Sequence, residues 1–316
     1  VAWTLHNGAA KTYLDGALKD TRGFAPNTVL GSGIIGYNSN PVGEDWLGPI
    51  DDIRIYNRAL TAAEVSTLFN QEKPVRDVSA GWRHSLFLRN DGSLWASGWN
   101  EKGQLGDSTT SDRTTPIRTV SNGVIAAAAG YYHSLYVDVN GALWAMGDNS
   151  KGQLGDGTII NRSTPVKIVN SGVTAVAAGQ YHSLFVKSDG SLWAMGNNAN
   201  GQLGDGSTTQ RNSPVQIVAN GIEFVSAGQH HSLFLTTGSI LKAMGGNAHG
   251  QLGDGSTTQR TSPVQIATTV TGLAAGGLHS HFIKSDGSLW STGYNFYGQL
   301  GNGATSALST PVKVIN

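Results

Sequence analysis

The chain contains no cysteine among its 316 residues. It therefore has neither a disulfide framework nor thiol chemistry, which excludes the class of small secreted domains held together by disulfide bonds. Export itself is not excluded, because a chain of this length buries enough apolar surface to fold without disulfides.

Charge is also scarce. Charged residues make up 13% of the chain, with 21 basic and 21 acidic side chains. Residues 1–72 carry a net charge of −3 and the remainder carries +3. Neither part has the strongly basic surface that binding to phosphate backbones requires. We therefore expect no nucleic-acid partner.

Long apolar runs are missing as well. No stretch approaches the roughly 18 apolar residues that a membrane-spanning helix needs, so we expect no membrane insertion in this segment. No signal peptide opens the sequence, because Val1-Ala2-Trp3-Thr4-Leu5 already has the pattern of a strand. We expect the chain to start inside a domain, so this says nothing about export.

Motifs for catalysis are absent too. The sequence contains no Gly-x-Ser-x-Gly, no His-Glu-x-x-His and no Gly-x-x-x-x-Gly-Lys-[Ser/Thr]. Its Gly-x-Gly turns lie between predicted strands instead of opening a helix, where a nucleotide phosphate would bind. We expect a protein that is not an enzyme and that needs no cofactor or metal.

Glycine is abundant, with 43 residues, and it marks an internal repeat. The tetrapeptide Gly-Gln-Leu-Gly starts at Gly103, Gly152, Gly201, Gly250 and Gly298, at spacings of 49, 49, 49 and 48 residues. A His-Ser pair and a proline recur in the same register, at His84, His133, His182, His231 and His279 and at Pro116, Pro165, Pro214, Pro263 and Pro311. Three markers in one register indicate five copies of one structural unit.

Each unit is predicted to contain four short strands. In the third copy these are Val173–Gly179, His182–Lys187, Ser191–Met195 and Pro214–Val218, and Asp189-Gly190 forms a hairpin turn. The small residues of the first strand suit a crowded position near an axis. Four strands in a period of about 40–50 residues are typical of a propeller blade.

The repeated pattern joins Gly-x-x-His-Ser-Leu, Asp-Gly-x-Leu-Trp-Ala-x-Gly-x-Asn, Gly-Gln-Leu-Gly and a late Pro-Val. It resembles the regulator of chromosome condensation repeat family over about residues 74–316. The resemblance implies an all-β fold, a β-propeller of five four-stranded units. Family members usually close with seven blades, so the units form either a five-bladed ring or, as we favour, part of a seven-bladed one. The predicted repeats span about 75–123, 124–172, 173–221, 222–270 and 271–316.

The first seventy residues lack this period. We expect strands over Lys11–Leu18, interrupted by a turn, and over Gly31–Tyr37 and Gly48–Tyr56, then one helix capped by Thr61 with Glu64. This segment resembles the C-terminal half of a laminin-G-like, concanavalin A-like jelly roll. The resemblance lies in three motifs: Tyr-Leu-Asp-Gly, Gly-Pro-Ile-Asp-Asp-Ile-Arg-Ile-Tyr-Asn-Arg-Ala-Leu and Ala-Ala-Glu. We predict a partial β-sandwich over 1–70 and a linker over 71–74.

The positions shared by the copies have two interpretations each. The five histidines could bind a metal or an anion, but we favour a hydrogen bond to the backbone of the neighbouring blade. The aspartates of the Gly-Asp-Gly loops could bind calcium, but we favour turn formation. Trp95 and its counterparts are predicted to pack between blades. In the fourth copy, where Gly238-Ser239 replaces Asp-Gly and Lys242 replaces the tryptophan, we expect an altered hairpin.

The positions that differ between copies are free of a shared packing role. Several carry aromatic or basic side chains in loops, which is typical of a binding face. The candidate binding residues are Trp82, Arg83, Trp99, Tyr131, Tyr132, Tyr181, His230, Tyr294, Phe296 and Tyr297.

These observations favour a non-catalytic binding or structural module of an exported bacterial surface protein. It would mediate adhesion or assembly through a protein or glycan ligand, or through neighbouring subunits. The extracellular or cell-surface location is inferred from the pairing of the two domain types. The alternative is a partner-binding propeller that inhibits an enzyme or acts as an exchange factor for a GTPase. The near-constant spacing leaves no room for the inserted wedge on which exchange activity in this family depends.

Overall fold

The computed structural model describes residues 2–6, 9–14, 17–23, 61, 62, 64 and 75–315. The chain divides into two compact units, Val1–Pro74 and Val75–Asn316. Among the described residues, no helix is long and apolar enough to span a bilayer.

The first unit contains one antiparallel sheet in its described part, in the order β1-β2-β3. Its strands are β1 (Ala2–His6), β2 (Ala9–Leu14) and β3 (Ala17–Gly23). The predicted capping box is confirmed, because the amide of Thr61 donates to Glu64 Oε2 at 2.8 Å and the amide of Glu64 donates to Thr61 Oγ1 at 3.2 Å. The strands predicted at 31–37 and 48–56 lie outside the described residues.

The second unit consists of five antiparallel four-stranded sheets, so the predicted all-β propeller architecture is confirmed. The first blade comprises β4 (Val75–Ala80), β5 (His84–Arg89), β6 (Leu94–Gly98) and β7 (Arg113–Val120). The second blade comprises β8 (Val124–Ala129), β9 (His133–Asp138), β10 (Leu143–Gly147) and β11 (Arg162–Val169). In each blade the strands pair in chain order.

The other three blades repeat this plan. The third comprises β12 (Val173–Ala178), β13 (His182–Lys187), β14 (Leu192–Gly196) and β15 (Arg211–Val218). The fourth comprises β16 (Ile222–Ala227), β17 (His231–Thr236), β18 (Leu241–Gly245) and β19 (Arg260–Ala267). The fifth comprises β20 (Val270–Ala275), β21 (His279–Lys284), β22 (Leu289–Gly293) and β23 (Leu308–Ile315).

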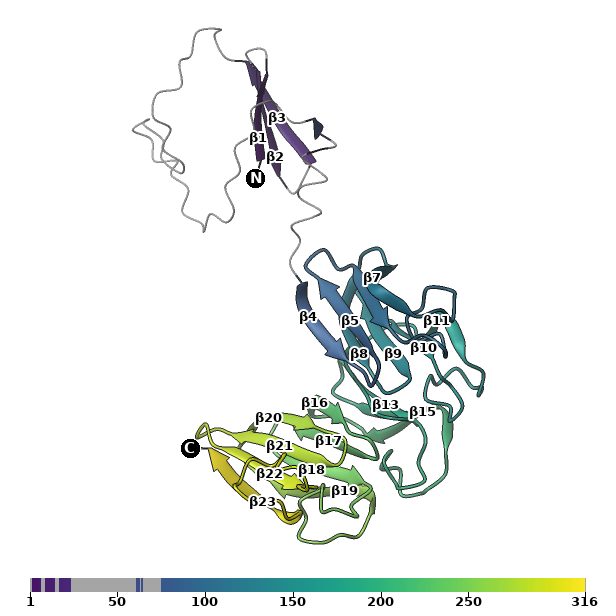
Figure 1. The fold of residues 1–316 in the computed structure, drawn as a ribbon, viewed down its shortest axis with the longest axis vertical. Coiled ribbons are helices and arrows are strands. Elements are labelled where there is room, and N and C mark those ends of the chain that lie inside the picture. Colours follow the sequence, from purple (N-terminus) through teal and green to yellow (C-terminus); the bar gives the residue numbers. More distant parts are fainter. Residues whose placement is uncertain are drawn as a thin grey trace. The chain divides into compact units, whose positions relative to one another are not determined.

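The blades follow one another around an arc (Figure 1). The first strands of successive blades contact one another, which places the small-residue strands on the inner side, as expected. Four apolar clusters fill the four interfaces between consecutive blades. Among the described residues, no such cluster joins β4–β7 to β20–β23. The five blades therefore leave the arc open.

Two local predictions need correction. The fourth strand begins at Arg211 in the third blade, so Pro214 lies inside β15 instead of at its first residue. Proline is tolerated there because β15 is an edge strand whose register against β14 shifts between Ala194 and Gly196. The hairpin of the fourth blade is not altered either, since Ser239 adopts φ +58° where Gly190 has +76°. The amide of Ser239 donates to the Thr236 carbonyl at 2.9 Å, as the amide of Gly190 does to Lys187 at 2.8 Å.

Candidate functional site

The repeated histidines join neighbouring blades. In the third blade, His182 Nε2 lies 2.9 Å from Ser232 Oγ of the fourth blade. The Ser232 hydroxyl donates back to the Gln202 carbonyl oxygen of the third blade at 2.8 Å. The same relay occurs from His84, His133 and His231. The expected structural role is therefore confirmed, but the partner is a serine hydroxyl and not the backbone.

The relay fixes the protonation of these imidazoles. A serine hydroxyl has one hydrogen, and the glutamine carbonyl accepts it, so Nε2 of the histidine must carry the hydrogen that serine accepts. Nδ1 is then unprotonated, and in His182 it is buried with no partner among the described residues. Burial lowers the pKa to about 3 in His133, His182 and His231 and to about 4 in His84. The four rings are neutral structural groups at pH 7.

The fifth histidine departs from this pattern. His279 is only partly buried and makes no bond to a serine hydroxyl in the described part of the chain. Its ring instead lies edge-on to His281, with centroids 4.9 Å apart. Four of the five repeated histidines therefore make the hydrogen bond between blades, and the fifth lies at the open end of the arc.

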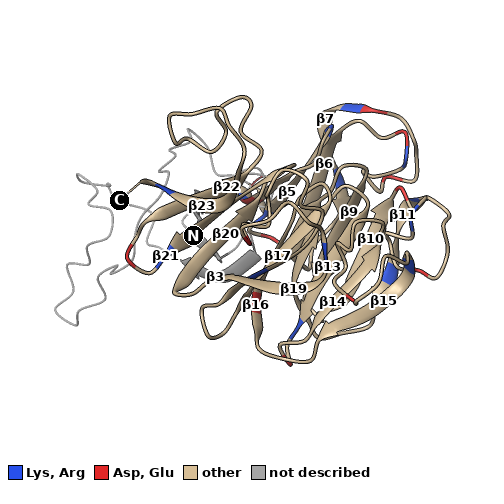
Figure 2. Cartoon of the chain, turned by 90° about the horizontal axis from the view of Figure 1, so that it is seen from below, with Lys and Arg blue, Asp and Glu red and all other residues tan. Residues whose placement is uncertain are grey.

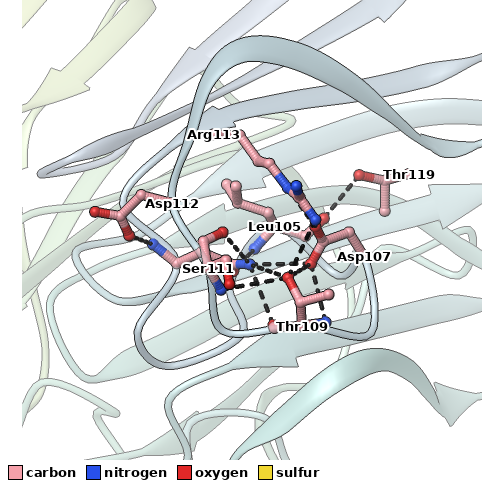
Figure 3. A network of polar contacts seen from close by, with 8 residues as sticks. Leu105, Asp107, Thr109, Ser111, Asp112, Arg113 and Thr119 are labelled. Carbon is pink, nitrogen blue, oxygen red and sulfur yellow. Dashed lines mark hydrogen bonds and ion pairs between the residues drawn. The ribbon is translucent and has the colours of Figure 1, made fainter.

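The loop aspartates are held by internal contacts (Figure 3). Asp107 Oδ1 accepts hydrogen bonds from Asn100 Nδ2 at 2.9 Å and from Thr109 Oγ1 at 2.7 Å. Its Oδ2 pairs with the Arg113 guanidinium at 2.5 Å. The pairs Asp156–Arg162, Asp205–Arg211 and Asp254–Arg260 repeat this ion pair.

The contacts of these aspartates support the turn-forming interpretation. Burial alone would raise the pKa of Asp205, but hydrogen bonds from Ser207, Arg211 and Asn198 outweigh it, and the pKa is lowered. Both carboxylate oxygens of Asp205 already have protein partners. Among the described residues, no group of three or more His, Asp or Glu side chains is placed to hold a metal ion. The aspartate therefore fixes its loop to the start of the fourth strand.

The fifth blade provides a natural test of this ion pair, because Asn302 and Leu308 stand where Asp205 and Arg211 stand in the third blade. We expect Arg211→Leu alone to lower the unfolding free energy by about 1–3 kcal/mol, since it leaves the buried Asp205 carboxylate without its cation. Adding Asp205→Asn should restore stability to within about 1 kcal/mol of wild type. Urea unfolding of the two variants measures this, and a double variant no more stable than the single one would contradict it.

The repeated tryptophans lie at the border of the inter-blade core. Trp193 is partly buried and stacks on Phe185, with centroids 6.1 Å apart and an interplanar angle of 5°. Its Nε1 donates to Ser191 Oγ at 2.9 Å, and the Lys187 ammonium lies 4.9 Å from the ring. The predicted packing role is thus confirmed, and a lysine ammonium also contacts the tryptophan ring.

The variable loop positions are brought together by the backbone. In each blade the loop before the second strand bonds to the loop after the third strand, as the Trp99 amide donates to the Arg83 carbonyl at 2.8 Å. Gly98 allows this approach because its φ is +106° and a Cβ there would lie 2.8 Å from the His84 Cα. The fold therefore gathers residues from two loops of every blade on one rim.

Six of the predicted binding residues form a continuous cluster on this rim. Trp82 and Tyr131 stack at 6.2 Å, and the Arg83 guanidinium lies 3.9 Å from the Trp82 ring centroid. Tyr132 contacts three further rings edge-on or tilted, namely Trp82, Trp99 and Tyr181, at 5.4, 5.7 and 5.4 Å. We call this cluster the first aromatic patch; it comprises Trp82, Arg83, Trp99, Tyr131, Tyr132 and Tyr181.

An open depression of about 430 Å³ lies beside this patch. Its polar lining consists of Glu101, Lys102, Asp148, Ser150 and Asn161. These residues were not among the sequence candidates. Glu101, Lys102, Asp148 and Ser150 flank the shared Asn of the loops and so differ between copies, which is a signal that could have identified them. Asn161 had no such signal, because its role is local: Asn161 Oδ1 accepts the Asn149 amide at 2.9 Å.

The other candidates lie apart from the first patch. Tyr294, Phe296 and Tyr297 contact one another in the fifth blade. Tyr294 also contacts His249 of the fourth blade, which the sequence candidates did not include. Phe296 and Tyr297 are strongly exposed, at 65% and 82%. We call these four residues the second aromatic patch. His230 belongs to neither patch; burial lowers its pKa, and its Nδ1 is buried without a partner among the described residues.

Charge does not concentrate on the propeller. Figure 2 shows acidic and basic residues interspersed over the loops and strand ends, with most of the ribbon uncharged. Arg83 of the first patch lies near a depression whose lining combines Lys102 with Glu101 and Asp148 in the same way. The charges near this rim therefore provide no strong long-range attraction of one sign.

The chain is similar to known proteins in both of its parts. The family model of the concanavalin A-like lectin/glucanases superfamily matches residues 1–66. Among curated proteins, the ultraviolet-B receptor UVR8 of Arabidopsis thaliana is 39% identical over 44 residues, which are 14% of this chain and 10% of the receptor. The chain thus matches about a tenth of that relative's length.

Solved structures give a longer match. Human WBSCR16 has a TM-score of 0.70 at 26% identity, covering 78% of this chain and 68% of that one. Yeast RCC1 (Prp20), crystallised with Kap60, has a TM-score of 0.69 at 21% identity, covering 79% and 63%. A second structure of Prp20p from Saccharomyces cerevisiae, reported with its binding properties to Gsp1p and histones, has a TM-score of 0.67 at 22% identity, covering 79% and 65%. The RCC1-like domain model matches residues 42–316, so the chain belongs to the RCC1-like domain family.

Proposed function

We propose that this chain is a non-catalytic module that binds a protein partner through the first aromatic patch. RCC1-like propellers generally serve as binding or exchange-factor modules, and protein binding is common among them. The proposal rests on one observation, namely that the patch is built from positions that the repeat leaves free. Its rings take no part in the histidine–serine relay between blades or in the ion pairs that hold the loops within the first four blades.

The composition of the patch favours a protein ligand. Tryptophan, tyrosine and arginine are the side chains that most often carry interface energy. Trp82 is 48% exposed although its ring is held by Arg83 and Tyr131, so a large surface is presented in a fixed orientation. Rigid rings lose little conformational entropy on binding. Glu101, Lys102 and Ser150 supply a polar border for the depression, as expected around an interface core.

We further propose that the module works at a bacterial cell surface, in adhesion or assembly, without a cofactor. The support for this is the pairing of an RCC1-like propeller with a segment similar to concanavalin A-like lectins. The predicted boundary near residues 71–74 is part of the same proposal. The near-constant repeat spacing remains the reason to rank an exchange factor below a surface-binding module.

The test compares two matched double variants of the full chain. Trp82→Ala with Tyr131→Ala removes the stacked pair of the first patch, whereas Phe296→Ala with Tyr297→Ala removes an exposed pair from the second patch. Proteins from the cell-surface fraction of the source are retained on each immobilised chain, and affinity is then measured for the purified partner. We expect the first variant to weaken binding by about 1.4–4 kcal/mol, which is at least tenfold, and the second to leave it unchanged.

Two outcomes would oppose the proposal. The first is a partner that both variants and the wild type retain equally. The second is a wild-type chain that binds a neutral glycan on an array through Trp82 and Tyr131, because the ligand class would then be carbohydrate.

A further inference from the structure

The depression beside the first aromatic patch contains a buried carboxylate. Asp148 lines this depression although only 5% of the residue is exposed. Its Oδ2 accepts hydrogen bonds from Gln153 Nε2 at 2.8 Å and from Ser150 Oγ at 3.0 Å. Among the described residues, no ion pair involves Asp148. A carboxylate that is removed from water in this way is costly unless a cation compensates its charge.

The loop aspartates of the first four blades show how the chain otherwise compensates such a group. Their side chains are 5–8% exposed, and each pairs with an arginine, as Asp205 does with Arg211 at 2.6 Å. Asp148 is comparably buried and lacks such a partner in the described part of the chain. Lys102, which also lines the depression, is paired already, because its Nζ lies 3.3 Å from Glu101 Oε1. The lining therefore keeps one uncompensated negative charge.

The repeat does not require this charge. Asn197 holds the equivalent position in the third blade, and its Oδ1 accepts the Ala199 amide at 3.0 Å. Asp148 Oδ1 accepts the equivalent amide at 3.3 Å. The bond from Gln153 is dispensable as well, since Nε2 of the equivalent Gln202 is buried without a partner among the described residues. A neutral amide thus builds the same loop, and the second copy alone carries a charged residue at this position.

Aromatic rings share the depression with the carboxylate. Trp99, Tyr132 and Tyr181 belong to its lining, and the Tyr132 ring centroid lies 5.7 Å from that of Trp99 and 5.4 Å from that of Tyr181. Lysine and arginine head groups are attracted to aromatic rings within about 6 Å. The Arg83 guanidinium lies against Trp82 and is not part of the lining. The depression therefore offers a carboxylate and three rings to a cation from another molecule.

The surface next to the depression favours a cation that belongs to a protein. Ile159 and Ile160 directly precede Asn161 of the lining, and they are 58% and 61% exposed. The other four copies carry threonine or serine at both positions. An exposed apolar pair beside aromatic rings is typical of an interaction surface, and a free small cation would leave it uncovered. These residues and Asp148 lie in the second blade, whose interfaces with both neighbouring blades are filled.

We propose that the depression receives a lysine or arginine side chain of the protein partner, with Asp148 as its counter-ion and Trp99, Tyr132 and Tyr181 in contact with its head group. This inference rests on the proposed function, because it assigns a chemical identity to the partner of the first aromatic patch. The buried charge selects the partner in two ways. It attracts a cation at short range, and it disfavours a neutral side chain that would cover Asp148 and leave it unpaired.

The test uses peptides as probes of the full chain. Short random peptides displayed on phage are selected on the immobilised wild-type chain. The tightest binder is synthesised, together with versions in which each lysine or arginine is replaced by glutamine, and affinities are measured by calorimetry. These replacements are measured on the wild-type chain, so this part of the test does not depend on the folding of a variant.

Two variants of the chain are compared with the same peptides. Asp148→Asn removes the charge and keeps the acceptor oxygen that Asn197 supplies in the third blade. Asp189→Asn is the matched control, because Asp189 is exposed and its Oδ1 accepts the Ser191 amide at 2.8 Å, in the hairpin at the other end of β13 from the rim. Circular dichroism checks that both variants fold.

We expect the selected peptide to contain a lysine or arginine whose replacement weakens binding to the wild-type chain at least about tenfold. Asp148→Asn should weaken binding of the original peptide by a similar factor, whereas Asp189→Asn should bind as the wild type does. Combining Asp148→Asn with the replaced peptide should weaken binding little further, since both changes remove the same charge pair.

Three results would overturn the inference: a selection that yields no peptide or only peptides without a cation, an Asp148→Asn variant that binds as tightly as wild type, and losses that add in full. Trp82→Ala with Tyr131→Ala separates such a failure from failure of the proposed function. A peptide that needs the two rings but not Asp148 would contradict the inference alone. A peptide that needs neither the rings nor Asp148 would contradict both.

Discussion

The propeller is expected to lose about 8 kcal/mol of unfolding free energy between pH 7 and pH 5. His84, His133, His182 and His231 are neutral in the folded chain, with pKa values lowered by burial to about 3–4. In the unfolded chain they titrate near 6.5, so the unfolded state binds more protons below that pH. Stability is therefore complete above pH 6.5 and falls as pH drops toward the folded values, by about 2 kcal/mol for each histidine at pH 5.

This loss is comparable to the whole stability of a typical domain, about 5–15 kcal/mol, so unfolding should begin between pH 5 and 4. Urea titrations followed by circular dichroism at pH 7, 6 and 5 measure it. The loop aspartates affect stability in a separate pH range. Because their pKa values are lowered in the folded chain, their protonation reduces the unfolding free energy only below about pH 4. An unfolding free energy that stays constant from pH 7 to pH 5 would show that the four imidazoles are not buried neutral groups.

Gly179→Ala should be among the most damaging single substitutions in the propeller. A Cβ at Gly179 would overlap the His182 ring and lie 2.6 Å from the Gly228 carbonyl oxygen of the next blade. Neither the ring nor the carbonyl can move aside easily, because the ring is hydrogen-bonded to Ser232 and the carbonyl follows the end of a strand of the next blade. Because the φ of Gly179 is not positive, the effect is steric alone, and we expect a loss of about 3 kcal/mol or more.

The chain contains a matched control for this substitution. Gly276 holds the same position in the last blade, and a Cβ there would also meet its histidine, His279. The three described atoms nearest to that Cβ all belong to the His279 ring, however, and His279 is only partly buried, so its ring can move aside. Thermal and urea unfolding should show Gly276→Ala losing less than half as much stability as Gly179→Ala. Equal losses would mean that the carbonyl and the fixed ring do not set the penalty.

The repeat made most of the fold predictable. A His-Ser pair kept at one spacing five times identifies a unit, and the residues between the markers show alternation and turn chemistry that define strands. The start of the fourth strand was missed because Arg211, Asn212 and Ser213 have no strand propensity of their own. They join the sheet through the pairing of Arg211 with Gly196 of β14, and the fifth blade starts its strand at the equivalent Leu308 without an ion pair, so the cause is a cross-strand contact that local sequence does not show.

The partners of the repeated histidines were not predictable either. His182 and Ser232 lie 50 residues apart, and each belongs to a pair whose two members serve different interfaces. Comparison of the copies did identify the rim residues, but not their division into two patches. That division depends on which blades carry aromatic residues just before the repeated histidine: the first three blades do, with Trp82, Tyr131 and Tyr132, and Tyr181, whereas the fifth blade has Gly277 and Leu278 there.

We assign the repeated positions to blade packing and propose that the variable rim binds a partner, and one stability measurement tests this division most directly. The unfolding free energy of Trp82→Ala with Tyr131→Ala is compared with that of wild type by urea titration at pH 7. We predict a loss below about 1.5 kcal/mol, since only ring contacts on an accessible surface are removed. A loss of about 3–5 kcal/mol, as for aromatic residues removed from a core, would show that the patch belongs to the packing of the blades and would contradict its assignment as a binding surface.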